Sequence, residues 1–342
     1  MNSLYLFAIV SIVFSLALTP FVKKIAVQLK IIDIPEGNRR IHNKPIPLLG
    51  GLSIYFSFVI TLLLKQGSLT GDEMGLILGA TVIVIGGLLD DKFDIKPRYK
   101  LVFQLAATLI LMIYGVRISV VTNPFSSLYE FVDVGIMFIP LTIIWVVGIT
   151  NALNLIDGLD GLAAGIGLIS ALTILIIALL NKRYEAAILA VILCGALLGF
   201  LPYNFNPASI FMGDTGAQLL GFLLAAISIE GALKSAAAFS IAVPILALGI
   251  PIYDTLFAMI RRKINGKPIM QADRGHLHHR LLDMGFSQKQ AVVTMYIISA
   301  VLGSFSIIAM EINVQSSYFL LAIVMVILVL IAWRVGFFKH RE

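Results

Sequence analysis

Long apolar stretches alternate with short polar segments along almost the whole chain. A bilayer core about 30 Å thick needs roughly 20 helical residues per crossing. Eleven stretches come close to this length, and they lack the strict alternation of barrel strands. The pattern predicts an all-α, polytopic integral membrane bundle of about eleven helices (ten to eleven). The predicted spans are 3–22, 49–65, 74–90, 100–117, 132–150, 161–180, 185–201, 215–231, 236–260, 291–311 and 316–337.

Composition supports the membrane class. The chain is 59% hydrophobic and 13% charged, with a mean hydropathy of +0.98, whereas soluble proteins average about 25% charged residues. The first apolar stretch has no Lys or Arg before it and no small-residue cleavage site after it, which favours a retained helix over a signal peptide. The single cysteine, Cys194, excludes an intrachain disulfide. We find no repeat, and expect one integral domain over residues 1–342.

The basic residues are distributed unevenly between the loops. If the amino terminus lies outside, the loops after odd-numbered spans and the tail hold 20 of the 25 Lys and Arg residues. The positive-inside rule then predicts an outside amino terminus and a cytoplasmic carboxyl terminus. The net charge of +6 reflects this topology, and nucleic-acid binding is not expected. The cytoplasmic segments expected to carry the chemistry are about 23–48, 91–99, 151–160, 202–214 and 261–290.

An Asp-Asp-x-x-Asp pattern ends the third apolar stretch. Asp90, Asp91 and Asp94 follow it directly, and Lys96 and Lys100 come next. Neighbouring carboxylates repel each other and are costly to desolvate, so the pattern indicates either a solvated helix end or a divalent cation. We favour a Mg²⁺–diphosphate site, with the lysines neutralising the remaining phosphate charge.

A second polar segment has a three-residue spacing. Asn151, Asn154, Asp157 and Asp160 follow one another at this interval, which places them on one face if the segment is helical. The glycines that follow both aspartates allow close backbone approach to a helix or a ligand. The alternative is a polar cap beside helix-packing glycines.

A third segment precedes the eighth span. Asn204 lies in its first part, and Phe211 and Asp214 lie in its last part, where the sequence reads Phe-Met-Gly-Asp-Thr-Gly. Asp214 is placed either to cap the next helix or to hold a metal–phosphate group at its amino end. Phe211 is suited to stacking on a flat ring or to anchoring at the membrane interface.

Three of the five histidines lie within four residues of the longest cytoplasmic loop. His276, His278 and His279 are flanked by Arg274 and Arg280. Histidines at this spacing can form a transition-metal site, but the adjacent arginines would repel a metal and favour phosphate. We favour sugar-phosphate recognition over zinc.

Two weaker signals remain. Asp254 lies within the ninth span, and we expect it to face the bundle and pair with a cation. A Lys-Pro-x-Pro-x-x-Gly-Gly segment begins at Lys44 and is either an ordinary basic loop or part of the site.

Together these motifs resemble the polyprenyl-phosphate N-acetylhexosamine-1-phosphate transferase family over nearly the whole chain. Asp94 and the His-Leu-His-His form are similar to the undecaprenyl-phosphate N-acetylglucosamine-1-phosphate transferases of bacteria. The related phospho-N-acetylmuramoyl-pentapeptide transferases carry lysine in place of Asp94 and three consecutive histidines. This departure argues against the muramoyl substrate.

The resemblance implies a cytoplasm-facing cleft in the bacterial inner membrane. It implies transfer of N-acetylglucosamine 1-phosphate from its UDP-linked donor to undecaprenyl phosphate, releasing UMP. This is the first membrane step of a cell-wall or surface polysaccharide such as teichoic acid or O-antigen. Mg²⁺ is the implied cofactor, with Mn²⁺ as an alternative, and the family suggests a homodimer. The alternatives are another UDP-N-acetylhexosamine, the muramoyl-pentapeptide donor or, in a different class, a secondary transporter.

The resemblance also implies roles for individual residues. Asp214 and Asp91 would hold the metal, Asp90 would act as base or orient the lipid phosphate, and the other two catalytic acids would support the nucleotide and metal. The implied catalytic residues are Asp90, Asp91, Asp157, Asp160 and Asp214. The implied nucleotide and sugar-phosphate contacts are Lys44, Asp94, Lys100, Asn154, Asn204, Phe211, His276, His278, His279 and Arg280.

Overall fold

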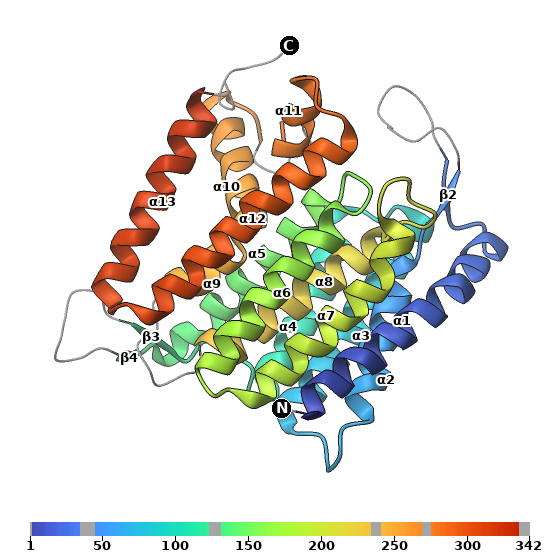
Figure 1. The fold of residues 1–342 in the computed structure, drawn as a ribbon, viewed down its shortest axis with the longest axis horizontal. Coiled ribbons are helices and arrows are strands. Elements are labelled where there is room, and N and C mark those ends of the chain that lie inside the picture. Colours follow the sequence, from blue (N-terminus) through green and yellow to red (C-terminus); the bar gives the residue numbers. More distant parts are fainter. Residues whose placement is uncertain (1, 35–44, 123–130, 234–240, 269–274, 335–342) are drawn as a thin grey trace.

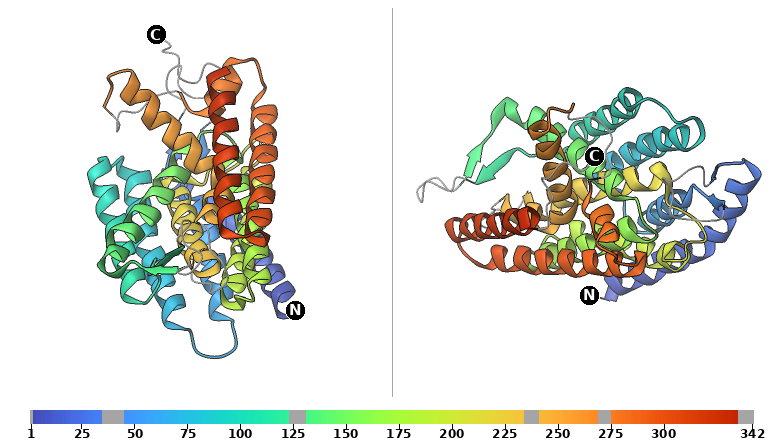
Figure 2. Two further views of the ribbon diagram at one scale, coloured as in Figure 1. Left: turned by 90° about the vertical axis from the view of Figure 1, so that its left-hand side faces the viewer. Right: turned by 90° about the horizontal axis from the view of Figure 1, so that it is seen from above.

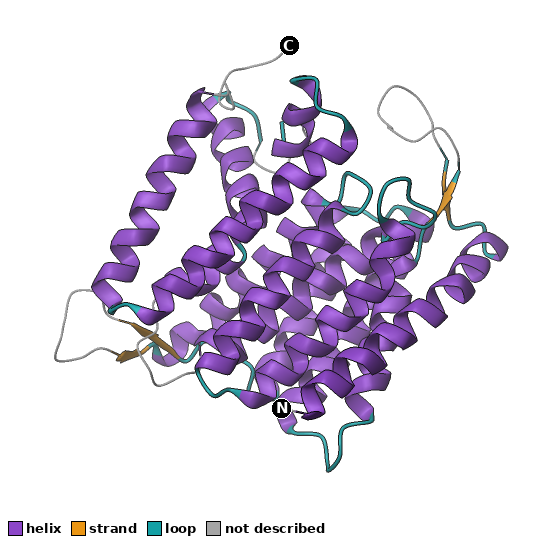
Figure 3. Cartoon of the chain, viewed as in Figure 1, coloured by secondary structure: helices purple, strands orange, loops and turns teal. Residues whose placement is uncertain are grey.

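Helices account for most of the chain (Figures 1 and 3). The computed structural model describes residues 2–34, 45–122, 131–233, 241–268 and 275–334. Among them, seven helices are long and apolar enough to cross a bilayer, and further apolar helices are shorter. The prediction of a polytopic helical membrane protein is therefore confirmed. The helices are α1 (Asn2–Gln28), α2 (Gly50–Leu63), α3 (Gly71–Phe93), α4 (Pro97–Ile113), α5 (Phe138–Ile156), α6 (Leu162–Leu180), α7 (Tyr184–Asn204), α8 (Gly213–Ser228), α9 (Ala242–Ala247), α10 (Gly249–Ile264), α11 (Leu277–Asp283), α12 (Gln288–Glu311) and α13 (Val314–Arg334).

Two short antiparallel strand pairs were not predicted. β1 (Ile32–Asp33) pairs with β2 (Ile46–Pro47), and β3 (Val120–Thr122) pairs with β4 (Phe131–Asp133). Figure 1 shows β2 and β3–β4 at opposite ends of the bundle. These pairs are only connections between helices, so the all-α class stands.

The predicted ninth span, 236–260, does not form one helix. Its described part consists of α9 and α10, with a break at Leu248. Pro251 has no N–H to donate to the carbonyl of Ala247, and Gly249 is a weak helix former. The break is therefore a local consequence of the sequence. Residues 236–240 lie outside the described residues.

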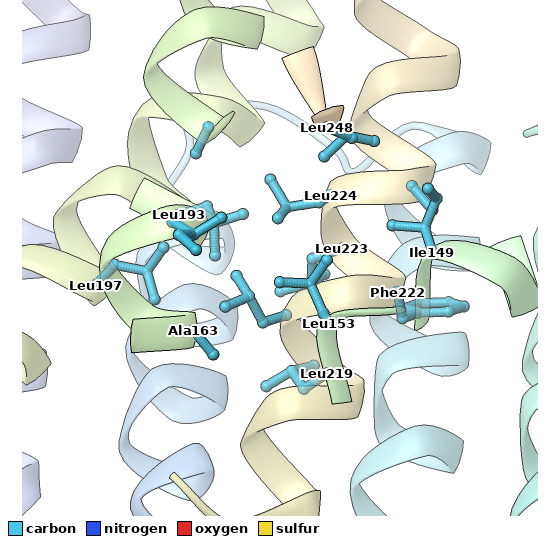
Figure 4. Packing of buried hydrophobic residues seen from close by; sticks show 14 of the residues in the cluster. Ile149, Leu153, Ala163, Leu193, Leu197, Leu219, Phe222, Leu223, Leu224 and Leu248 are labelled. Atoms are coloured by element: carbon cyan, nitrogen blue, oxygen red, sulfur yellow. The ribbon is translucent and has the colours of Figure 1, made fainter. Parts of the chain in front are cut away.

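α8 forms the centre of the bundle. All of its residues except Asp214 are buried, and it packs against α2, α3, α5 and α6. Figure 4 shows Leu219, Phe222 and Leu223 of α8 among apolar side chains that include Leu153 of α5. The amino end of α8 is thereby held in the middle of the molecule.

Glycines allow the neighbouring helices to approach α8 closely. A Cβ atom on Gly87 of α3 would lie 2.3 Å from the Thr215 Cα atom. A Cβ atom on Gly221 of α8 would lie 2.6 Å from the Thr150 Cα atom of α5. Helices in lipid associate mainly through such close packing. The carboxyl ends of α3 and α5 are consequently fixed beside the start of α8.

The two ends of the bundle differ. Figure 1 places α11 and the loops around the start of α8 at one end, and the start of α1 with the α2–α3 turn at the other. α13 packs against α12 and α9 and lies at an edge of the bundle (Figures 1 and 2). The predicted polar clusters therefore lie towards a common end.

Candidate active site

Seven aspartates line one cavity, and five of them are the predicted catalytic acids. Asp90 and Asp91 lie in the last turn of α3, Asp157 ends α5, Asp160 lies in the following turn, and Asp214 lies in the first turn of α8. The cavity has a volume of about 540 Å³. Its lining residues are Asp33, Leu48, Asp90, Asp91, Asp94, Asp157, Gly158, Leu159, Asp160, Asn204, Phe211, Gly213, Asp214, His279 and Gln288.

Asp91 binds the amino end of α8. One carboxylate oxygen accepts a hydrogen bond from the Asp214 backbone N–H at 2.7 Å. The other accepts from the Thr215 backbone N–H at 3.1 Å and from the Thr215 hydroxyl at 2.6 Å. The first backbone N–H groups of a helix have no partner within the helix. Asp91 therefore acts as a cap supplied by another helix, and it fixes the position of Asp214.

Asp214 is held by two donors from neighbouring helices. The Lys100 ammonium of α4 lies 2.5 Å from one carboxylate oxygen, and the Asn154 amide of α5 donates to the other at 2.7 Å. Lys100 also forms an ion pair with Asp90. Asp90 in turn accepts a hydrogen bond from the Ile95 backbone N–H at 3.1 Å. Lys100 thus joins two of the predicted catalytic acids, and Asn154 orients one of them.

The two acids that follow α5 have different surroundings. Asp160 accepts hydrogen bonds from the Asn206 amide at 3.0 Å and from the Ala208 backbone N–H at 2.9 Å, which ties the α5–α6 turn to the loop after α7. Desolvation, together with the negative charges of Asp214, Asp91 and Asp160, raises the pKa of Asp157 to about 8. A cation bound nearby would offset this repulsion and favour the ionised form of Asp157.

The Pro-x-Pro-x-x-Gly-Gly segment supports the loop before α8. The Phe211 backbone N–H donates to the Pro47 carbonyl, and the N–H groups of Gly50 and Gly51 donate to the carbonyls of Phe211 and Met212. A Cβ atom on Gly51 would lie 2.2 Å from the Gly216 Cα atom. The glycines are therefore needed for close packing, and this segment is part of the support of the site.

Three further predicted residues line the cavity. Asn204 donates from its amide to the Ile210 carbonyl at 3.1 Å, and its amide oxygen is buried without a hydrogen-bond partner among the described residues. Phe211 also lines the cavity, and Asp94 does so from the left-handed position that ends α3. Lys44, predicted to contact phosphate, lies outside the described residues.

The histidine segment reaches the cavity through one of its three rings. His279 lines the cavity, whereas His276, His278 and Arg280 are buried and are not among its lining residues. The His276 and His278 rings stack with centroids 6.0 Å apart, and His278 lies 4.2 Å from His279. Burial lowers the pKa of His278 to about 3. His278 is therefore neutral near pH 7, so positive charge in this segment does not come from its ring.

Asp254, expected to pair with a cation, is buried and lies 2.7 Å from the Nδ1 atom of His276. The carboxylate and the ring come from α10 and from the residue before α11. This contact engages one nitrogen of His276. Recognition of a sugar phosphate by this segment, in preference to zinc binding, stays a prediction.

Sequence reasoning missed a buried amide cluster beneath the acids. The Gln104 amide donates to Gln218 at 3.0 Å, and the Asn151 amide donates to Gln104 at 2.8 Å. Gln104 lies one turn after Lys100 on α4, and Gln218 lies one turn after Asp214 on α8. These four-residue intervals on apolar helices were the available signal. The cluster fixes α4, α5 and α8 relative to one another directly below the acids.

The donor set fits a magnesium ion bound together with substrate. Mg²⁺ uses one or two carboxylates and completes its shell with water and phosphate oxygens. No group of three His, Cys, Asp or Glu side chains with the geometry to hold a metal occurs within the described parts of the chain. Asp214 and Asp91 would supply the carboxylates, and the crowded negative charge around Asp157 favours an added cation. Magnesium binding stays a prediction.

Comparison with known proteins gives consistent relatives. Residues 74–232 match the model of "Glycosyl transferase family 4". A Bacillus subtilis protein named "Probable undecaprenyl-phosphate N-acetylglucosaminyl 1-phosphate transferase" is 40% identical over 97% of this chain and 92% of its own length. A Mycolicibacterium smegmatis decaprenyl-phosphate N-acetylglucosaminephosphotransferase is 35% identical over 82% of this chain and 75% of its own.

A more distant relative extends the comparison. The Escherichia coli undecaprenyl-phosphate alpha-N-acetylglucosaminyl 1-phosphate transferase is 28% identical over 92% of this chain and 84% of its own length. The similarity to the Bacillus protein extends over nearly the full length of both chains and includes every segment that forms the cavity. The chain therefore belongs to the polyprenyl-phosphate N-acetylhexosamine-1-phosphate transferase family, within glycosyl transferase family 4.

Proposed function

We propose that this protein transfers N-acetylglucosamine 1-phosphate from UDP-N-acetylglucosamine to undecaprenyl phosphate and releases UMP. One observation carries the proposal. Asp90, Asp91, Asp157 and Asp214 meet beside Lys100 at one end of a membrane bundle, in a chain that resembles a named transferase over 97% of its length. A lipid phosphate and a water-soluble nucleotide sugar can meet only at such an end.

The reaction exchanges one phosphoanhydride bond for another. An oxygen of the lipid phosphate attacks the phosphorus that bears the sugar, and the bond from that phosphorus to the UMP oxygen breaks. A bound Mg²⁺ ion would neutralise diphosphate charge as the leaving group departs. A phosphate monoester is largely ionised near neutral pH, so positioning is more important than proton removal.

The residues of this chain divide the positioning task. Asp214 would hold the cation, and Asp91 keeps Asp214 in place through the start of α8. Lys100, between Asp90 and Asp214, supplies a positive charge for phosphate oxygens. Asp90 would orient the lipid phosphate. Asn204 and Phe211 would contact the nucleoside from the cavity wall.

We place this end of the bundle in the cytoplasm, with the amino terminus outside, in the inner membrane of a bacterium. The support is the concentration of 20 of the 25 Lys and Arg residues in loops on that side. UDP-sugars are made in the cytoplasm, which requires the same orientation. A homodimer stays a prediction from the family.

A secondary transporter is disfavoured by the position of the acids. Transporters bind their substrates near the membrane midplane, at discontinuous helices related by internal repeats. Here the acids lie at helix ends and in the turns that follow them.

The proposal is tested with purified protein, undecaprenyl phosphate, Mg²⁺ and a panel of UDP-sugars, with UMP release as the readout. We expect UDP-N-acetylglucosamine to be the preferred donor and Asp214→Asn to release no UMP. If folded wild-type protein releases no UMP with any donor, the proposed function is wrong. Preference for UDP-N-acetylgalactosamine or the muramoyl-pentapeptide donor would change only the sugar.

A further inference from the structure

Asp254 makes two contacts that lie outside the cavity. Its carboxylate, buried in α10, accepts a hydrogen bond from the Leu277 backbone N–H at 2.8 Å. The other carboxylate oxygen lies 2.7 Å from the His276 Nδ1 atom. One side chain from α10 therefore holds both the residue before α11 and the first residue of that helix.

α11 depends on this contact for its start. His276 occupies the position before the helix with extended backbone angles, φ −64° and ψ 154°, and its side chain forms no cap. Helix starts normally use a Ser, Thr, Asp or Asn side chain at this position to accept a backbone N–H. Asp254 performs the same task from a different helix. The pairing also selects the His276 form that carries a proton on Nδ1.

A row of three neighbouring histidine rings, of which the first two are stacked and the third is tilted, connects Asp254 with the cavity. The His276 and His278 rings are nearly parallel, with 9° between their planes, and His278 contacts His279 at the cavity wall. His278 also lies against the turn after α5, because a Cβ atom on Gly158 would lie 2.5 Å from its Nε2 atom. The ring row thus borders both the cavity and the turn between Asp157 and Asp160.

We propose that Asp254 is a positioning residue for the water-soluble donor. By fixing His276 and the start of α11, it sets the placement of His279 and of the turn after α5 against the donor. The argument rests on the proposed function for the identity of that donor. The lipid acceptor must reach the cavity from the membrane, whereas α11 is a short helix beyond the membrane spans, so the effect should concern the donor.

Asp254→Asn separates the two tasks of the carboxylate. The asparagine oxygen can still accept the Leu277 N–H, while its amide presents a donor to the His276 Nδ1 atom in place of the carboxylate acceptor. Glu73→Gln is a matched control, because Glu73 is equally buried and pairs with Lys65 at 2.7 Å at the start of α3, away from the cavity.

The experiment measures KM for donor and acceptor, kcat and the unfolding temperature for each variant. We expect Asp254→Asn to raise the donor KM at least tenfold, with the acceptor KM within twofold and the unfolding temperature close to that of wild type. His276→Ala should show the same donor KM shift, and the double variant should be no worse than His276→Ala alone. Glu73→Gln should leave the donor KM unchanged.

Other results would overturn the proposal. A wild-type donor KM in Asp254→Asn, or equal losses for donor and acceptor accompanied by a lower unfolding temperature, would show a purely structural role. If Asp254→Asn does not fold, His276→Ala decides alone, and a wild-type donor KM in that variant refutes the proposal. Calorimetric titration of UDP-N-acetylglucosamine with Mg²⁺ gives donor affinity without turnover. A wild-type protein that binds the donor but releases no UMP would contradict the proposed function and still leave this inference testable by affinity.

Discussion

Replacing Asp91 by Asn should inactivate the protein by disturbing the start of α8. The carboxylate accepts three hydrogen bonds from Asp214 and Thr215, at 2.7, 3.1 and 2.6 Å. An asparagine has nearly the same size but only one oxygen. That oxygen can accept from the Asp214 N–H, and the amide can donate to the Thr215 hydroxyl, but the Thr215 N–H then loses its acceptor.

The size of the effect follows from these contacts. A buried N–H without a partner costs about 1–3 kcal/mol, and a hydrogen bond to a charged group contributes about 1.5–3 kcal/mol. We therefore expect the free energy of unfolding to fall by about 2–3 kcal/mol. Because each 1.4 kcal/mol lost from the transition state slows the reaction about tenfold, displacement of Asp214 should leave less than about a tenth of the turnover.

Thermal unfolding in detergent and UMP release measure the two effects separately. Thr215→Val is the matched control, since it removes the hydroxyl donor and keeps both backbone bonds to Asp91, and its losses should be smaller on both scales. Asp214→Asn should abolish turnover with a smaller effect on unfolding. The reasoning is refuted if Asp91→Asn unfolds at the wild-type temperature and keeps more than about a tenth of wild-type turnover.

Three further predictions concern pH, packing and topology. The folded pKa of Asp157, about 8, lies above its usual value of about 3.9, so the folded metal-free protein holds this proton more tightly than the unfolded chain. The unfolding temperature should therefore fall as pH rises from about 4 to about 8. Asp157→Asn should flatten this fall, and an unchanged slope would contradict the raised pKa of Asp157. Gly158→Ala places a Cβ atom 2.5 Å from the His278 ring, so it should cost about 1–3 kcal/mol of stability and reduce UMP release. Wild-type values in both assays would show that the turn after α5 can shift to accommodate the methyl group. In a Cys194→Ala background, a cysteine at Ser68 should react with an impermeant maleimide in intact cells and one at Asn265 only after permeabilisation; the reverse would place the site outside.

The helices were predictable because lipid requires each span to satisfy its own backbone hydrogen bonds with long apolar runs. The ends of those runs also located Asp90, Asp157 and Asp214, since charged groups near a bilayer are placed where they can be solvated or paired. Pro251 and Gly249 indicate a break near Leu248, but the length of the apolar run led to the prediction of a single span. Boundaries within such runs are set by single residues, which hydropathy averages out.

Contacts between distant segments were not predictable in the same way. Asp91 was expected beside the metal and Asp90 as a base or orienting residue, but their protein partners were not foreseen: Asp90 pairs with Lys100, and Asp91 binds the backbone of α8. Spacing along α3 cannot distinguish these roles, because they depend on which helix lies opposite each carboxylate. The same applies to Asp254, whose partner is His276, the residue before α11.

The acids of the site are placed by the packing of α8 more than by their own loops. Gly87 allows α3 to touch Thr215, which brings Asp91 to the first turn of α8. Below this turn, Gln104 and Gln218 connect α4 and α8 one turn away from Lys100 and from Asp214. The Gln104–Gln218 contact is buried and the Asp91 contacts are partly buried, and together they position the acids within the protein itself. A site that works by aligning two phosphates and a cation needs this preorganisation, because misplacement by a single ångström is costly for catalysis.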